Sequence, residues 1–152
     1  MWRDLRLRAL RDAPEAFCAT YADESTRTDE EWQAAMERPG VRWVIPAAPG
    51  ALGEVAAQGV AIAGAFPTTP DGPLEMCSVW VAPQVRGLGA GRALVAAAVE
   101  EAAAAGRPGV QLWVRAANGP ARRMYERCGF VETGTEHGEG PLRELLLSRA
   151  TD

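Results

Sequence analysis

The stretch at residues 79–94 most restricts what this chain can fold into. A buried strand ends near Val81, and an apolar helical pattern begins near Ala90. Three glycines lie around this junction at alternate positions: Gly87, Gly89 and Gly91. A loop of this kind leaves bare backbone N–H groups at the positive end of a helix, which favours binding of a phosphate or pyrophosphate. Glycine-rich turns also serve as plain connectors, so this pattern alone leaves both interpretations open.

The composition argues against several classes of function. All 16 basic residues are arginine, so the chain offers neither a P-loop lysine nor a Schiff-base lysine. His137 is the only histidine, which argues against a histidine-built metal site and a Ser-His-Asp triad. We therefore expect no metal. A net charge of −4 without a basic tract gives no electrostatic basis for binding nucleic acid.

Length and cysteine content predict one reduced, soluble unit. At 152 residues the chain is expected to form a single domain, residues 1–152, with a core that needs no disulfides. No apolar run reaches the length of a membrane span, and the first residues lack the apolar core of a signal peptide. Cys18, Cys77 and Cys128 are odd in number and widely spaced, as reduced thiols are. We expect a cytoplasmic protein without a membrane partner.

Hydrophobic periodicity predicts two helices, three strands, a helix, a strand, a helix and two strands, which is a mixed α/β sheet with helices on its faces. The predicted helices cover residues 2–10, 28–38, 90–105 and 118–128, and the predicted strands cover residues 41–45, 54–66, 74–81, 110–114, 130–133 and 142–147. The strand at 74–81 alternates little, so we expect it to be covered on both faces.

Local signals set several details of this order. Thr28 and Glu31 have the spacing of a helix capping box. Trp32, with Ala35 and Met36, is predicted to form the buried stripe of that helix. The last two strands are predicted to be joined by a mobile loop through His137.

Two motifs then resemble one known family. Residues 84–89 match the (Gln/Arg)-x-x-Gly-x-(Gly/Ala) acetyl-CoA motif of the GNAT-type N-acetyltransferase superfamily. Residues 118–130 are similar to its second signature, with Asn118, Ala121 and Tyr125 ahead of a Gly-Phe pair. The resemblance covers roughly residues 74–133, whereas the N-terminal half, which in this family varies with substrate, matches weakly. It implies a GNAT-like, mostly antiparallel sheet flanked by helices.

The resemblance also implies how acetyl-CoA is held. The backbone of six consecutive residues would bind the CoA pyrophosphate: Arg86, Gly87, Leu88, Gly89, Ala90 and Gly91. The strand edge at Val79 and Val81 would pair with the pantetheine arm, which Asn118 would also reach. The amide of Val81 would polarise the thioester carbonyl.

Acid and base candidates follow from the same resemblance. Tyr125 would lie near the thioester sulfur, where a phenol, protonated at neutral pH, can donate a proton; the alternative is a tyrosine that only packs in the core. Glu75 is the best base candidate, because a carboxylate in an apolar strand is costly without a task or a partner. It could equally mark an exposed strand start, and many family members have no single essential base.

Three further residues lie near the implied acceptor channel. Cys77 and Ser78 flank it, although a cysteine there is usually part of the core and we expect no acyl-cysteine intermediate. His137 could line the acceptor site from its loop, or face solvent.

The predicted function is acetyl-CoA-dependent N-acetyl transfer, made directly to the amine of a small molecule or peptide. The alternative is a non-catalytic acyl-CoA-binding module. Dinucleotide binding is disfavoured, since the glycine spacing is not Gly-x-Gly-x-x-Gly. The acceptor is not specified by the sequence, and the net charge of −4 leans only weakly towards a cationic amine.

The start of the chain departs from the family pattern. Members usually begin with a strand before the first helix, and this chain begins inside that helix. Either the sheet lacks its usual first strand or the true start codon lies upstream. An unpaired edge would favour pairing with a second copy, as a homodimer.

Overall fold

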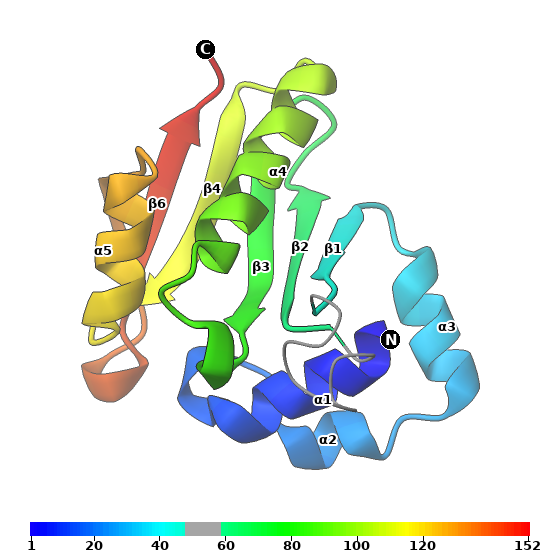
Figure 1. The fold of residues 1–152 in the computed structure, drawn as a ribbon. Helices are drawn as coiled ribbons and strands as arrows, with labels where there is room; N and C mark the ends of the chain where they lie inside the picture. Colours follow the sequence, from blue (N-terminus) through cyan, green and yellow to red (C-terminus); the bar gives the residue numbers. More distant parts are fainter. Residues whose placement is uncertain (48–58) are drawn as a thin grey trace.

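The structure, a computed structural model, describes residues 1–47 and 59–152. These residues form a six-stranded sheet in the order β1-β2-β3-β4-β6-β5, with helices packed on its faces (Figure 1). The strands are β1 (Val41–Ile45), β2 (Ala61–Pro67), β3 (Leu74–Val81), β4 (Gly109–Arg115), β5 (Val131–His137) and β6 (Glu144–Ala150). Neighbours are antiparallel except β3 and β4, which are parallel. The predicted mixed α/β class is confirmed.

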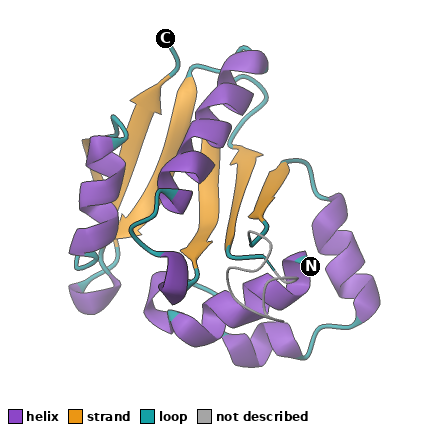
Figure 2. Ribbon diagram, viewed as in Figure 1, coloured by secondary structure: helices purple, strands orange, loops and turns teal. Residues whose placement is uncertain are grey.

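Helices surround the sheet on several sides (Figure 2). They are α1 (Trp2–Asp12), α2 (Tyr21–Ser25), α3 (Asp29–Glu37), α4 (Ala90–Ala104) and α5 (Gly119–Arg127), with short 3-10 turns η1 (Pro14–Ala16), η3 (Pro83–Val85) and η4 (Gly140–Leu142). None of these described helices is both long and apolar enough to cross a membrane.

Two hydrophobic clusters lie on opposite faces of the sheet. On one face, Leu94 and Val95 of α4 pack with Met76 of β3 and Leu112 of β4, all at most 2% exposed. On the other face, a second cluster joins Leu5 of α1 to β2 and β3. Alternate residues of β2 enter different clusters, as the two-residue period of a strand requires. We call these the α4 face and the α1 face.

The element order is confirmed, but some boundaries differ. The structure agrees closely with the helices predicted at 2–10 and 90–105 and with the strands predicted at 41–45 and 74–81. The predicted capping box is present: Glu31 N donates to Thr28 Oγ1, and Thr28 N donates to Glu31 Oε2. The strand predicted at 54–66 begins at Ala61, and its part at 54–58 lies outside the described residues. Helix α2, five residues long and capped by Thr20, was not predicted, because so short a segment shows no periodicity.

The C-terminal strands were predicted too short, and the loop through His137 was wrong. His137 lies in β5 and pairs with Glu144 of β6. The ladder continues through the glycine-containing segment because Gly134 adopts a φ of 85° at an irregularity in the register. Pairing with the full length of β4 likewise extends β6 to Ala150.

The buried stripe predicted for the helix at α3 was only partly right. Trp32 is 6% exposed, but Met36 is 42% exposed. The reason is that Trp32 packs beneath the guanidinium groups of Arg3 and Arg27 rather than against an apolar core. Met36, one turn later, therefore lies at the rim of a hollow and not inside the protein.

Replacing Thr28 by alanine should lower the free energy of unfolding by about 1 kcal/mol, because the capping oxygen at the start of α3 is lost. Urea unfolding followed by circular dichroism measures this change. Thr28→Ser keeps the oxygen and should stay near the parent. Equal destabilisation by both variants would show that the cap contributes little.

Candidate active site

The site is organised by a gap between the two parallel strands. β3 and β4 pair only from Leu74↔Val110 to Met76↔Leu112. Both strands continue beyond this point, β3 to Val81 and β4 to Arg115, without further pairing between them in the described residues. The remaining edge of β3 is therefore unpaired on the β4 side. Unpaired strand edges recruit another extended chain through backbone hydrogen bonds.

A β-bulge at Ser78 marks the start of this gap. Ser78 has a φ of 56°, a conformation rare for a non-glycine residue, and the β2–β3 register shifts beside it. The bulge reverses the alternation of β3, so that Val79 and Val81 pack towards the α4 face while Trp80 enters the α1-face cluster. On the α1 side, Arg6 Nη1 donates to Ser78 Oγ at 3.0 Å. As predicted, β3 has buried residues on both faces: Leu74 and Met76 on the α4 face and Trp80 on the α1 face.

The backbone of Val81 faces the gap. Ala82 N donates to Val60 O at 2.7 Å, on the β2 side of the strand. Successive residues of a strand direct their N–H and C=O groups to opposite edges, so Val81 directs its own towards the β4 side. The Val81 carbonyl accepts from Arg86 Nε at 3.0 Å. Its N–H points into the gap, where an oxyanion-stabilising donor would have to lie.

The glycine loop forms an anion cradle directly after this edge. Gly87 and Gly89 have φ values of 80° and 94°, and a Cβ at either position would meet no atom within 4 Å. No backbone hydrogen bond outside the regular elements uses the N–H of either glycine in the described residues. The helix α4 begins at Ala90, and its first-turn N–H groups lack intrahelical partners. These groups together fit a phosphate or pyrophosphate.

Two predicted loop residues differ from the others. Arg86 turns its side chain away from the cradle, because its guanidinium pairs with Asp12 at the end of α1. Its backbone N–H donates to the carbonyl of Pro83 at 3.3 Å, so it is not a free donor for an anion. Gly91 lies in the first turn of α4, where a Cβ would meet Met124 Cε of α5 at 3.4 Å, so it also allows close packing between the two helices. Leu88 is exposed at the loop tip.

Tyr125 lies in α5 on the α4 face of the sheet. It is 6% exposed and packs edge-on against Phe130, with ring centroids 5.7 Å apart. Burial raises the pKa of its phenol well above the usual value of 10, so the hydroxyl stays protonated. Within the described residues this hydroxyl makes no direct hydrogen bond to protein, and it is therefore able to donate to a ligand.

Asn118 and Glu75 both have protein partners. Asn118 caps α5, and its Oδ1 accepts from Ala121 N at 3.2 Å, which leaves its amide nitrogen available. The Glu75 carboxylate accepts from Gln111 Nε2 of β4 at 2.9 Å. Glu75 alternates with core residues of the α4 face and so lies on the α1 face, within the paired part of the two strands. The structure thus places Glu75 and Tyr125 on opposite faces.

The remaining acceptor-side candidates also lie on the α1 face. Cys77 is half-buried, and burial raises the pKa of its thiol. Ser78 lines a hollow between α1, α3 and the sheet. His137 is exposed and rests on Trp113, with ring centroids 4.2 Å apart. Its Nε2 lies 3.8 Å from the carboxylate of Glu144.

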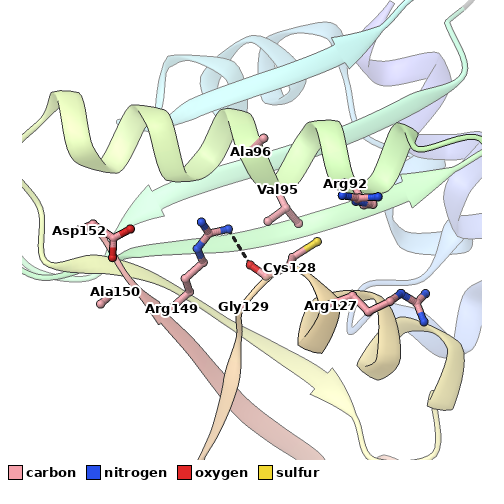
Figure 3. Close-up of a pocket in the computed structure, with 9 residues that line it drawn as sticks. All are labelled: Arg92, Val95, Ala96, Arg127, Cys128, Gly129, Arg149, Ala150 and Asp152. Atoms are coloured by element: carbon pink, nitrogen blue, oxygen red, sulfur yellow. Dashed lines mark hydrogen bonds between the residues drawn. The ribbon is translucent and has the colours of Figure 1, made fainter.

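A second hollow, which the sequence analysis missed, lies on the α4 face. It has a volume of about 620 Å³ and lies between α4, the end of α5 and the end of β6. Figure 3 shows three arginines around it, Arg92, Arg127 and Arg149, the last donating to the carbonyl of Cys128 at 2.6 Å. Arg92 belongs to the first turn of α4, so the hollow continues from the anion cradle. Its arginines come from three separate elements, and no local motif announces them.

Among the described residues, no cluster of three or more histidine, cysteine or carboxylate side chains could hold a metal ion.

Comparison with known proteins now defines the class. A sequence model of the Acetyltransferase (GNAT) family matches residues 5–130. The chain therefore belongs to this family, whose members are N-acetyltransferases that use acetyl-CoA. The resemblance inferred from residues 84–89 and 118–130 is confirmed.

Individual relatives show the same likeness. The chain is 29% identical to a mycothiol acetyltransferase of Brachybacterium faecium, with 89% of this chain and 38% of the relative covered. It is 34% identical to a mycothiol acetyltransferase of Thermobispora bispora, with 86% and 42% covered. The chain thus spans about two-fifths of the length of these relatives. Among solved structures, a ribosomal-protein-alanine N-acetyltransferase of Brucella melitensis superposes with a TM-score of 0.72, 25% identity, and 97% and 93% of the two chains covered.

The raised pKa of Tyr125 can be tested directly, because the chain has only two tyrosines. In Tyr21→Phe, the ultraviolet absorbance of the folded protein should show no tyrosine ionisation near pH 10, whereas the denatured chain should ionise at the ordinary value of about 10. Because the pKa is raised in the folded state, the unfolded state alone loses the proton above about pH 10, and stability should fall as pH rises beyond it. Ordinary ionisation in the folded variant would contradict the burial of this phenol.

Proposed function

We propose that this chain transfers an acetyl group from acetyl-CoA directly to an amine. The observation that carries the proposal is the continuity between the unpaired β3 edge, the Val81 N–H that faces the gap, and the anion cradle at the start of α4. The pantetheine arm of CoA is an extended chain with amide groups that ends in a pyrophosphate. It matches these binding features in their spatial order. Membership of the GNAT family supports the same conclusion.

Binding is divided between the backbone and the arginines. The N–H groups of Gly87, of Gly89 and of the first turn of α4 would hold the pyrophosphate. Val79 and Val81 would supply strand-like hydrogen bonds to the pantetheine arm, with the amide nitrogen of Asn118 as a further donor. The hollow lined by Arg92 and Arg127 would hold the remaining phosphate at the adenosine end, because guanidinium groups pair strongly with phosphate oxygens.

Acetyl-CoA supplies an activated acetyl thioester, and the residues of this chain assist its transfer. The N–H of Val81 would stabilise the negative charge that develops on the carbonyl oxygen as the C–N bond forms. Tyr125 would donate its proton to the sulfur as the C–S bond breaks. Glu75, on the α1 face, would accept the proton lost by the amine through water. One proton thus leaves the nitrogen and one reaches the thiolate, so the exchange balances.

The purified protein should gain thermal stability with acetyl-CoA and release CoA in the presence of a suitable amine. Tyr125→Phe should lower kcat roughly 10²-fold or more, the usual contribution of a general acid, while Tyr21→Phe should leave it unchanged. Glu75→Gln should lower kcat mainly at low pH, where a base is needed most. These measurements use a panel of amines and a thiol-detecting assay.

Two outcomes would contradict the proposal in different ways. No thermal shift with saturating acetyl-CoA would exclude the cofactor itself. A clear shift without CoA release from any amine would favour the non-catalytic acyl-CoA-binding module. If Tyr125→Phe and Glu75→Gln both kept full activity, the residues would act in positioning only, and catalysis would rest on the Val81 backbone.

The phosphate role of the second hollow has its own test. Arg127 is exposed, so Arg127→Gln should leave the fold intact. It should weaken binding of acetyl-CoA about tenfold, because a hydrogen bond to a charged group contributes about 1.5 kcal/mol. Acetyl-dephospho-CoA, which lacks the 3′-phosphate, should bind the parent and the variant equally. An equal loss for both ligands would show that Arg127 does not contact this phosphate.

A further inference from the structure

A separate hollow lies on the α1 face, at the opposite side of the sheet from the anion cradle. It has a volume of about 270 Å³ and is enclosed by α1, α2, α3 and the strands β1 to β3. Ser78, the bulge residue, lines it. Because the bulge marks the start of the gap between β3 and β4, this hollow adjoins the place where the proposed transfer would occur. A ligand there could approach the thioester from the face opposite to the cofactor.

The charge of this hollow is strongly positive. Four arginines line it: Arg6, Arg27, Arg38 and Arg42. Among the described residues that line it, Glu24 is the one carboxylate, and it is 4% exposed. Both of its oxygens are occupied by Arg6, at 3.0 Å and 2.9 Å. One carboxylate therefore faces four arginines, and the lining keeps a net positive charge.

These arginines differ in how far they are committed to the protein. Arg42 donates to the carbonyls of Ala35 and Met36 near the end of α3. Arg27 forms an ion pair with Glu24 at 3.7 Å, which is longer than a hydrogen bond. Arg38 is exposed and makes no ion pair or side-chain hydrogen bond in the described part of the chain. Arg27 and Arg38 thus keep donors for a ligand.

An uncharged donor in the same wall also lacks a partner. The indole Nε1 of Trp32 is buried and makes no hydrogen bond to any described residue, and the whole side chain is 6% exposed. Leaving such a donor unpaired costs about 1–3 kcal/mol. Trp2 and Phe66 supply apolar surface beside it. The lining therefore offers unused donors and aromatic surface.

We infer that this hollow binds the acceptor, and that the acceptor is a small amine which also carries an oxyanion, a carboxylate or a phosphate. The inference rests on the proposed acetyl transfer. Arginine and indole donors match oxyanion acceptors, and the limited volume favours a molecule of amino-acid size over a folded protein surface. The whole-chain charge of −4 would favour a cationic acceptor. The local charge decides binding, however, because distant surface charges are screened by salt.

The same positive charge suits the chemistry of the amine. The nitrogen must be neutral to attack, and nearby positive charges disfavour a protonated amine. A polyamine, which carries several positive charges and no anion, would be repelled by this lining. An amino acid would be attracted through its carboxylate while its amine is held in the reactive form.

The test compares matched acceptors that differ only in the anion. Phenylalanine, phenylalaninamide and phenethylamine form one series, leucine and leucinamide a second, and phosphoethanolamine and ethanolamine a third. CoA release is measured for each, with spermidine as the cationic reference. In at least one series, kcat/KM for the acceptor that carries the anion should exceed kcat/KM for the matched amine without it by about tenfold. This ratio is equivalent to about 1.4 kcal/mol. A preference for leucine and phenylalanine, or instead for phosphoethanolamine, identifies the anion.

Variants of the lining assign that preference to the hollow. Arg38→Gln and Arg27→Gln should each raise KM for the preferred anionic acceptor several-fold and leave its amide or plain amine unchanged. Arg38→Lys should restore part of the loss. Arg123→Gln, an exposed arginine of α5 outside both hollows, is the matched control and should behave as the parent. Trp32→Phe, which removes the unpaired donor, should also raise KM for the anionic acceptor.

Failure of this inference can be told apart from failure of the proposed function. A thermal shift with acetyl-CoA in the same samples reports the cofactor site alone. The inference is overturned if neutral amines or spermidine match or exceed their anionic counterparts, if no anionic acceptor of the panel is used, or if the double variant Arg27→Gln/Arg38→Gln keeps the anion preference. Loss of the acetyl-CoA shift would instead contradict the proposed function.

Discussion

The early end of pairing between β3 and β4 is the constraint on which the candidate site depends. Beyond Met76 and Leu112 the two strands no longer pair, so the β3 edge keeps backbone groups that elsewhere in a sheet would be satisfied. Such groups are tolerated where solvent or a ligand reaches them. The bulge at Ser78 acts at the same point. It reverses the alternation of side chains along β3, so that Val81 packs towards the α4 face. One local irregularity thus sets both the opening and the direction of the binding edge.

Features that depend on neighbouring residues could be predicted from the sequence. The capping box at Thr28 and the glycine loop at residues 87–91 are local, since each requires only backbone and side-chain groups a few positions apart. The bulge at Ser78 could not be predicted, because no glycine or asparagine signals a left-handed residue inside an apolar strand. His137 was misplaced because its glycine-rich surroundings read as a loop, whereas strand pairing decided its conformation.

The two charged hollows could not be predicted for a different reason. Arg27 precedes α3 and Arg38 follows it, and Arg92, Arg127 and Arg149 come from three elements. A sequence reports their number but not which of them are neutralised by carboxylates. Arg6 is an example, because its ion pair with Glu24 neutralises its positive charge. Net charge therefore described the whole surface and failed to describe either hollow, where the proposed ligands would bind.

The division of the site between two faces favours direct transfer over a covalent enzyme intermediate. Tyr125 lies on the α4 face, where the proposed cofactor would bind, and Glu75 lies on the α1 face with the proposed acceptor. An acid beside the sulfur and a base beside the amine are useful together only when both substrates are bound at once. Cys77, the cysteine of β3, has a thiol pKa raised by burial, and the thiol rather than the nucleophilic thiolate is thereby favoured. The gap between β3 and β4 then serves as the passage through which the amine meets the thioester, without an acyl-cysteine in between.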